Sequence, residues 1–141
     1  MKFEINNEGN YCIFYLFGDH SIEEMLAEHA EASKQFPDDP NFAILIEMTH
    51  ANVEFHLDDL RSVLNMNRVE MKNSGFLLRT AVVGRMMGLN LIGETFALLG
   101  FDLPLKLGTF NNLDAAVRWL GLESEQPEIE AAIARMAQQT Q

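Results

Sequence analysis

The sequence predicts an α/β fold in which helices cover a small mixed sheet. Two apolar segments joined by a turn at the N-terminus predict an antiparallel hairpin, and later apolar runs alternate with segments of helical periodicity. Because strands that alternate with helices pair in parallel, we expect the central strands to be parallel. With 141 residues, 48% of them apolar, the chain can form the core of one domain.

The first elements are the hairpin and a helix. Residues 1–5 and 11–18 read as strands, and the Asn-Asn-Glu-Gly-Asn stretch between them supplies turn residues. The spacing of Ser21 and Glu24 is that of a capping box, so a helix is expected to begin there. Pro37 ends this helix, because proline has no amide proton to donate.

Two nearly unbroken apolar runs predict strands buried on both faces of the sheet. They are FAILIEM at residues 42–48 and LRTAVVG at residues 78–84. Each is followed by a segment with apolar residues at helical spacing, over residues 57–73 and 86–99. Gly100 stops the second of these predicted helices.

The last part of the chain adds one more strand and two helices. A strand is expected over residues 103–109, a helix over 112–121, and a final helix with Pro127 in its first turn. We expect an α/β domain over residues 1–122 and a helical appendage over 123–141. The narrow apolar stripe of that appendage could dock on its own domain or on a second chain.

Composition excludes several classes of partner. The 21 acidic and 10 basic residues give a formal charge of -11, and the basic residues are scattered, so nucleic acid and anionic membranes are not expected partners. A single cysteine, Cys12, is expected in the core, with no intrachain disulfide. The N-terminus has no export signal and no segment is long enough to cross a bilayer, so we expect a cytoplasmic protein.

Four segments carry a resemblance to a known family. They are AILIEMT, then RTAVVG, then PLKLGTF, and finally NNLDAAVRWL, each in the expected order of strands and helices. This succession resembles the STAS superfamily, most closely the SpoIIAA-like proteins, over roughly residues 1–122. The resemblance implies a small open sheet with helices packed against it.

The resemblance also implies a function. It points to regulatory antagonists of anti-sigma factors and to lipid-binding domains of related topology. Those antagonists are switched by phosphorylation of a serine at the start of the helix after the central strand. In this chain the corresponding stretch, HANVEFHLDDL, has no serine or threonine after Thr49, and Ser62 lies inside the predicted helix.

The end of the central strand is the candidate ligand-binding site. Ligands of open α/β sheets bind at the carboxyl ends of parallel strands, and the polar residues expected there are Thr49, His50, His56 and Arg85. Arg85 could meet an anionic head group, or pair with a glutamate such as Glu47 or Glu54.

A metal site at the same place is an alternative interpretation. The histidines and the neighbouring Asp58 and Asp59 are metal-ligand types, but their spacing matches no known metal motif. Acidic residues in the first turn of a helix also favour the positive end of its dipole. We therefore predict no metal and no cofactor.

Residues 86–99 are apolar nearly all round the predicted helix, because Asn90, Glu94 and Thr95 are their only polar side chains. We expect a second subunit, the C-terminal helix or an apolar ligand to cover them, unless they are buried within one monomer. Flexible methionines suit such a surface. The candidate partner or apolar-ligand surface comprises Met66, Met71, Met86, Met87, Leu89 and Phe96.

These observations predict a non-enzymatic protein. No nucleophile elbow or catalytic triad can be assembled from the sequence. The leading hypothesis is a STAS-like regulatory or interaction domain, a homodimer that binds a protein partner through the helices predicted over residues 57–73 and 86–99. The alternative is a carrier or sensor of a lipid or other apolar small molecule, held between the helices and the sheet.

Overall fold

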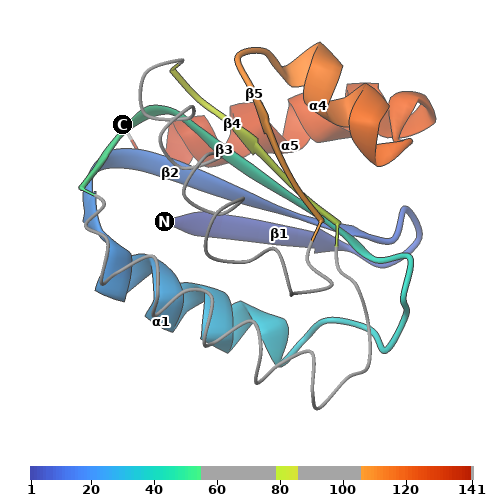
Figure 1. Ribbon diagram of the computed structural model, residues 1–141, viewed down its shortest axis with the longest axis horizontal. Helices are drawn as coiled ribbons and strands as arrows, with labels where there is room; N and C mark the ends of the chain where they lie inside the picture. The colour runs from blue at the N-terminus through green and yellow to red at the C-terminus, as the bar shows by residue number, and fades with distance from the viewer. Residues whose placement is uncertain (55–78, 86–105, 141) are drawn as a thin grey trace.

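The structure is a computed structural model that describes residues 1–54, 79–85 and 106–140 (Figure 1). Its centre is one five-stranded sheet in the order β1-β2-β3-β4-β5. β1 and β2 are antiparallel, and every later pair is parallel. The strands are β1 (Lys2–Asn6), β2 (Tyr11–Ser21), β3 (Ala43–Glu54), β4 (Arg79–Val83) and β5 (Lys106–Phe110). The predicted mixed sheet with an N-terminal hairpin and parallel central strands is therefore confirmed.

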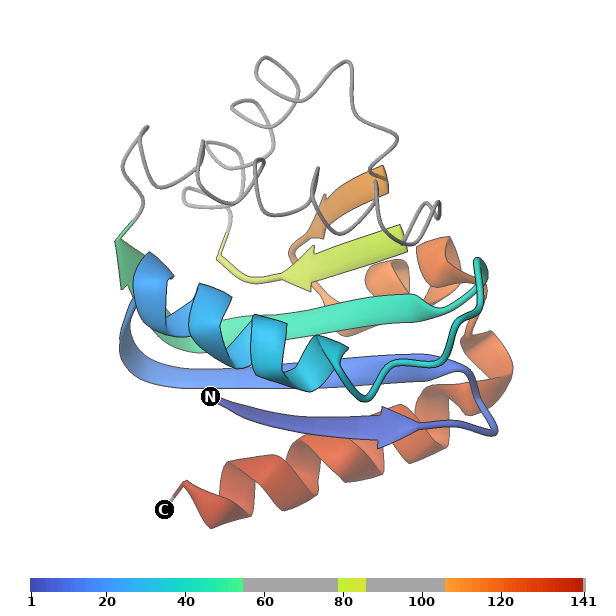
Figure 2. The same ribbon diagram turned by 90° about the horizontal axis from the view of Figure 1, so that it is seen from below.

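Helices lie on both faces of this sheet. The described α-helices are α1 (Ile22–Ser33), α4 (Leu113–Leu120) and α5 (Gln126–Gln139), with a short 3-10 turn at Glu123–Glu125 before α5. α1 lies on one face, and α4 and α5 lie on the other (Figures 1 and 2). Among the described residues, no helix is both long enough and apolar enough to cross a membrane. The predicted helices over residues 57–73 and 86–99 lie outside the described residues.

The alternation of side chains along the strands separates two cores. The α5-side core joins β-strand residues with α4 and α5, and comprises Tyr11, Ile13, Tyr15, Ala43, Leu45, Ala81, Val83, Ala116, Val117, Leu120, Ile129, Ala132 and Met136. The α1-side core comprises Cys12, Phe14, Leu16, Ala32, Phe42 and Ile44. Consecutive residues of β2 thus point to opposite faces. Cys12 is fully buried, as its apolar surroundings in the sequence predict.

The C-terminal helix packs on the sheet of its own chain. Ile129, Ala132 and Met136 are buried and share a core with Tyr11 and Ile13 of β2. These three α5 residues recur at helical spacing, so one stripe of α5 meets the sheet. Between the two docking modes that the sequence leaves open, the structure shows the intramolecular one.

Helix ends follow the predicted capping residues. The Ser21 hydroxyl accepts a hydrogen bond from the Glu24 amide at 3.2 Å, and Asn112 Oδ1 accepts from the Ala115 amide at 2.9 Å. Gly121 ends α4 with φ of 72°, a left-handed conformation that glycine adopts without a steric penalty.

Two strands are longer than the sequence pattern predicts. β2 continues to Ser21 rather than ending near Gly18, and β3 continues to Glu54 rather than ending near Met48. The added residues of β3 pair with β2 from His50 opposite Phe17 onward, and the added residues of β2 begin with Asp19 opposite Asn52. Polar residues there form a strand because each has a neighbouring strand to pair with, which the apolar pattern alone does not reveal.

Candidate functional site

Thr49 lies at a bulge in β3 and bonds to Glu47. Between the pairs Tyr15–Glu47 and Phe17–His50, β2 advances by two residues and β3 by three, so β3 carries one extra residue. The Thr49 amide donates to Glu47 Oε1 at 2.8 Å, and the Thr49 hydroxyl donates to the same oxygen. Glu47 is only 8% exposed, and these donors compensate for the burial of its carboxylate.

His50 lies on a two-stranded extension of the sheet. β4 ends at Val83, opposite Glu47, and beyond that point the described part of β3 pairs with β2 alone. His50 is exposed, and its partner in the register, Phe17, is 50% exposed. The predicted end of this strand at Met48 is therefore wrong, because strand pairing continues through His50 to Glu54.

Arg85 follows β4 as Thr49 follows the last residue of β3 that pairs with β4. That last pair is Val83 with Glu47. Arg85 and Thr49 each lie two residues farther along the chain than their own member of this pair, and Arg85 is exposed. Within the described ranges, no ion pair joins Arg85 to Glu47. The remaining predicted site residues lie outside the described residues: His56, Met66, Met71, Met86, Met87, Leu89 and Phe96.

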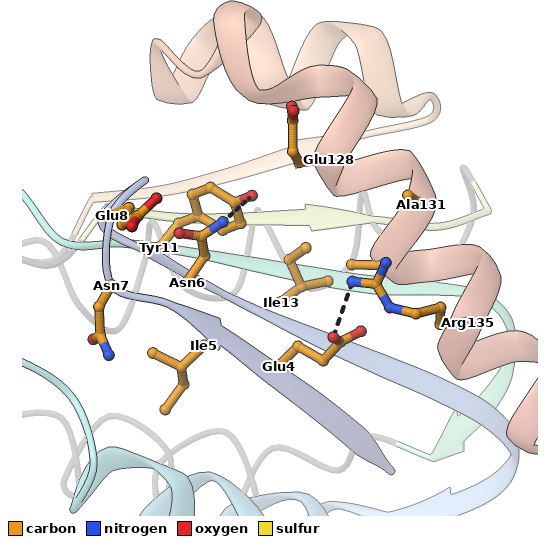
Figure 3. A pocket seen from close by; sticks show the side chains of 11 residues that line it. Glu4, Ile5, Asn6, Asn7, Glu8, Tyr11, Ile13, Glu128, Ala131 and Arg135 are labelled. Atoms are coloured by element: carbon orange, nitrogen blue, oxygen red, sulfur yellow. Dashed lines mark hydrogen bonds and ion pairs between the residues drawn. The ribbon is translucent and has the colours of Figure 1, made fainter.

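A groove of about 380 Å³ lies between the β1–β2 hairpin and α5 (Figure 3). Strand residues line its floor: Glu4, Asn6, Tyr11 and Ile13. On the helix, Glu128, Ala131, Ala132 and Arg135 line its wall. Their spacing of three, four and seven residues places all four on one side of α5.

Three hydrogen bonds hold side chains in place along the groove, and Figure 3 draws the two that join labelled side chains, Arg135 with Glu4 and Asn6 with Tyr11. Arg135 Nη2 donates to Glu4 Oε1 at 3.0 Å. Asn6 Nδ2 donates to the Tyr11 hydroxyl oxygen at 3.1 Å, while Asn6 Oδ1 accepts from the Gly9 amide at 2.8 Å. Through Asn6, these last two bonds tie the turn of the hairpin to the floor of the groove.

The groove is acidic. Glu4, Glu8 and Glu128 line it, and its cationic lining residue, Arg135, is already paired with Glu4. The second oxygen of Glu4, Oε2, is buried and has no hydrogen-bond partner among the described residues. The arrangement therefore suits a cationic group or a hydrogen-bond donor.

Tyr11 adds a hydroxyl group to this groove. Burial raises the pKa of Tyr11, and the charges of Glu125 and Glu128 raise it further, so the hydroxyl stays protonated at neutral pH. The hydroxyl oxygen accepts a hydrogen bond from Asn6, so the hydroxyl proton can be donated to another acceptor. An uncharged carbonyl oxygen suits this role, because the surrounding carboxylates would repel an anionic acceptor.

The buried reactive groups are poorly suited to catalysis. Burial raises the pKa of the Cys12 thiol to about 12, so the thiolate is scarce at neutral pH. Burial also lowers the pKa of His29 to about 4, which keeps its ring neutral. In the parts of the chain that the structure describes, no three histidine, cysteine, aspartate or glutamate side chains gather as a metal site would require.

The sequence prediction named Glu47 only as a possible partner of Arg85, and it missed both the contact of Glu47 with Thr49 and the groove. Glu47 has the local signal of a carboxylate inside an apolar strand, which is costly to bury without donors. The groove residues carry a weaker signal, which is the alternation of Lys2, Glu4 and Asn6 with apolar residues in β1 and the stripe of residues on α5. These two sets of residues come together only because of the way α5 packs on the sheet.

Comparison with protein-family models, with curated proteins and with solved structures found no match.

Proposed function

We propose that this chain is a non-enzymatic, STAS-like and SpoIIAA-like interaction domain of the cytoplasm. In this proposal it forms a homodimer and binds a protein partner through residues 57–73 and 86–99. The observation that carries the proposal is the order of the sheet, in which an antiparallel hairpin is followed by consecutive parallel strands. This order agrees with the small open sheet that the sequence resemblance implies.

The environment of the described reactive groups supports a binding role over catalysis. The Cys12 thiol is buried and the His29 ring is half-buried, and both have pKa values far from neutral pH. The Thr49 hydroxyl donates to the buried Glu47. This hydrogen bond compensates for the burial of the Glu47 carboxylate.

The choice of surface rests on the composition of residues 86–99. That stretch has too few polar side chains for a solvated helix, so an apolar partner surface would stabilise it. The exposed Arg85 directly before it favours the second candidate, a carrier whose apolar ligand has an anionic end.

Sedimentation at micromolar concentration tests the dimer. We expect the wild-type chain to sediment as a dimer and the double variant Met86→Asp, Met87→Asp to shift toward monomer, because buried carboxylates oppose association. The matched control, Gln138→Asp with Gln139→Asp, adds the same charge at exposed positions of α5 and should remain dimeric.

A wild-type chain that stays monomeric would contradict the proposed dimer. Native mass spectrometry of the same sample, purified without detergent, separates the two candidates. A stoichiometric apolar adduct that is lost in Arg85→Ala would support the carrier instead.

A further inference from the structure

β1 is the outermost strand of the sheet at the hairpin side. It pairs with β2 along one edge, so the backbone N–H and C=O groups on its other edge are directed away from the sheet. Within the described ranges, no further backbone hydrogen bond involves residues 2–6. This edge can therefore accept another strand.

The two faces of β1 differ in chemistry. Phe3 and Ile5 pack against the α1-side core, whereas Glu4 and Asn6 line the groove on the α5 side. Figure 3 shows Glu4 directed toward Arg135, whereas the side chain of Ile5, which also borders the groove, extends to the other side of β1. A strand added beside β1 would continue this alternation, so every second side chain of it would lie at the groove.

We propose that an extended segment of a partner protein adds to the free edge of β1 and places a lysine or arginine side chain in the groove beside α5. The backbone of that segment would complete the hydrogen bonds of β1. Its basic side chain would meet the carboxylates of Glu4 and Glu128, which line the groove.

Charge complementarity selects this occupant. The groove presents Glu4, Glu8 and Glu128, and the whole chain carries a formal charge of -11. A second copy of the chain would bring the same carboxylates against one another, and like charges in contact oppose association. The same negative charge attracts a basic segment and favours its binding.

This surface is distinct from the one proposed above for the protein partner. It uses none of residues 57–73 or 86–99, so the Met86 and Met87 variants leave it intact. Failure of the dimer would therefore say nothing about the groove, and the reverse also holds.

The test uses a short probe peptide that alternates valine with lysine, compared with one that alternates valine with glutamate. Fluorescence anisotropy should show saturable binding of the lysine peptide to the full chain and none of the glutamate peptide. Hydrogen exchange should show new protection at amides of Lys2–Asn6 when the lysine peptide binds, because strand addition satisfies the outer edge of β1. Attraction by charge alone would not protect these amides.

Two pairs of variants on α5 locate the binding. Glu128→Lys should weaken the lysine peptide about tenfold, whereas Glu130→Lys makes the same charge change outside the groove and should have little effect. Ala131→Trp should fill the groove and abolish binding, whereas Ala134→Trp should not. All four positions are exposed on the helix, so the variants are expected to fold.

Several results would overturn this inference. Equal binding of both peptides, equal effects within either variant pair, or no added protection along β1 would each do so. Self-association of the wild-type chain that Ala131→Trp abolishes and Ala134→Trp preserves would identify a second copy as the occupant, and would equally overturn the basic segment.

Discussion

At the scale of single residues, His29 is a half-buried base that forms no ion pair among the described residues. Its ring stacks on Phe14 with centroids 5.2 Å apart and meets Phe36 edge-on at 6.1 Å. Nδ1 is buried and has no hydrogen-bond partner among the described residues. Burial therefore lowers the pKa of His29 from 6.5 to about 4. The native state holds this histidine neutral, whereas the unfolded chain protonates it below its ordinary pKa.

This difference predicts how stability depends on pH. Between pH 6.5 and about 4 the unfolded state binds more protons at this position, so the free energy of unfolding falls as the pH falls. The loss should reach the order of 3 kcal/mol, the free-energy equivalent of the pKa shift. Urea denaturation across this range should show a shallower decline in His29→Leu than in the wild type.

Carboxylates in general also bind protons in this pH range, so the test is the difference between the stability curves of the wild type and His29→Leu. Parallel stability curves for His29→Leu and the wild type would show that the ring is not held neutral. A nuclear magnetic resonance titration of the His29 ring should give a midpoint near 4.

At the scale of elements, the end of α4 depends on one glycine. Gly121 has φ of 72°, its amide donates to the carbonyl oxygen of Arg118, and the following Leu122 amide donates to Val117. A Cβ atom at this position would meet no atom within 4 Å. Any cost of a side chain here therefore comes from the backbone conformation rather than from a clash.

Gly121→Ala is accordingly expected to lower the free energy of unfolding by about 1 kcal/mol, the cost of a left-handed conformation for an L-residue. Gly121→Asn should lower it less, because asparagine adopts this conformation more readily. Chemical denaturation measures both variants. Equal stability of Gly121→Ala and the wild type would contradict a backbone origin.

Most described elements could be predicted from the sequence because their signals are local. Apolar runs mark β3 and β4, Ser21 and Asn112 mark helix starts, and Gly121 marks a helix end. The polar continuation of β3 could not be predicted, because it depends on pairing with β2. Of the predicted site residues, Thr49 and Arg85 do lie near the end of β4. The groove could not be predicted, because it is formed by contacts between residues far apart in the sequence, such as Arg135 with Glu4.

At the scale of the whole molecule, the charge of -11 acts against compactness. Carboxylates brought together by folding repel one another more than they do in the extended chain. Among the described residues a few pairs offset this, such as Arg135 with Glu4 and Lys34 with Glu31. These pairs are exposed, and exposed pairs contribute little.

The thermal midpoint should therefore rise by a few degrees when sodium chloride is raised from about 0.01 M to about 0.15 M, since the Debye length falls from about 30 Å to about 8 Å. Potassium chloride should give the same rise, because screening depends on ionic strength. Calorimetry measures the midpoint, and a value that is flat or falls with salt would contradict the importance of net charge.

The consecutive order of the strands also bears on synthesis at the ribosome. Each strand that emerges pairs with the one made just before it, so the sheet can grow from β1 to β5 without waiting for a distant partner. α5 is the exception, because it emerges last and packs against the hairpin made first. Until α5 has been made, Tyr11 and Ile13 lack their apolar cover. The α5-side face of the nascent sheet is then exposed and can be bound by chaperones, whereas it is buried in the finished protein.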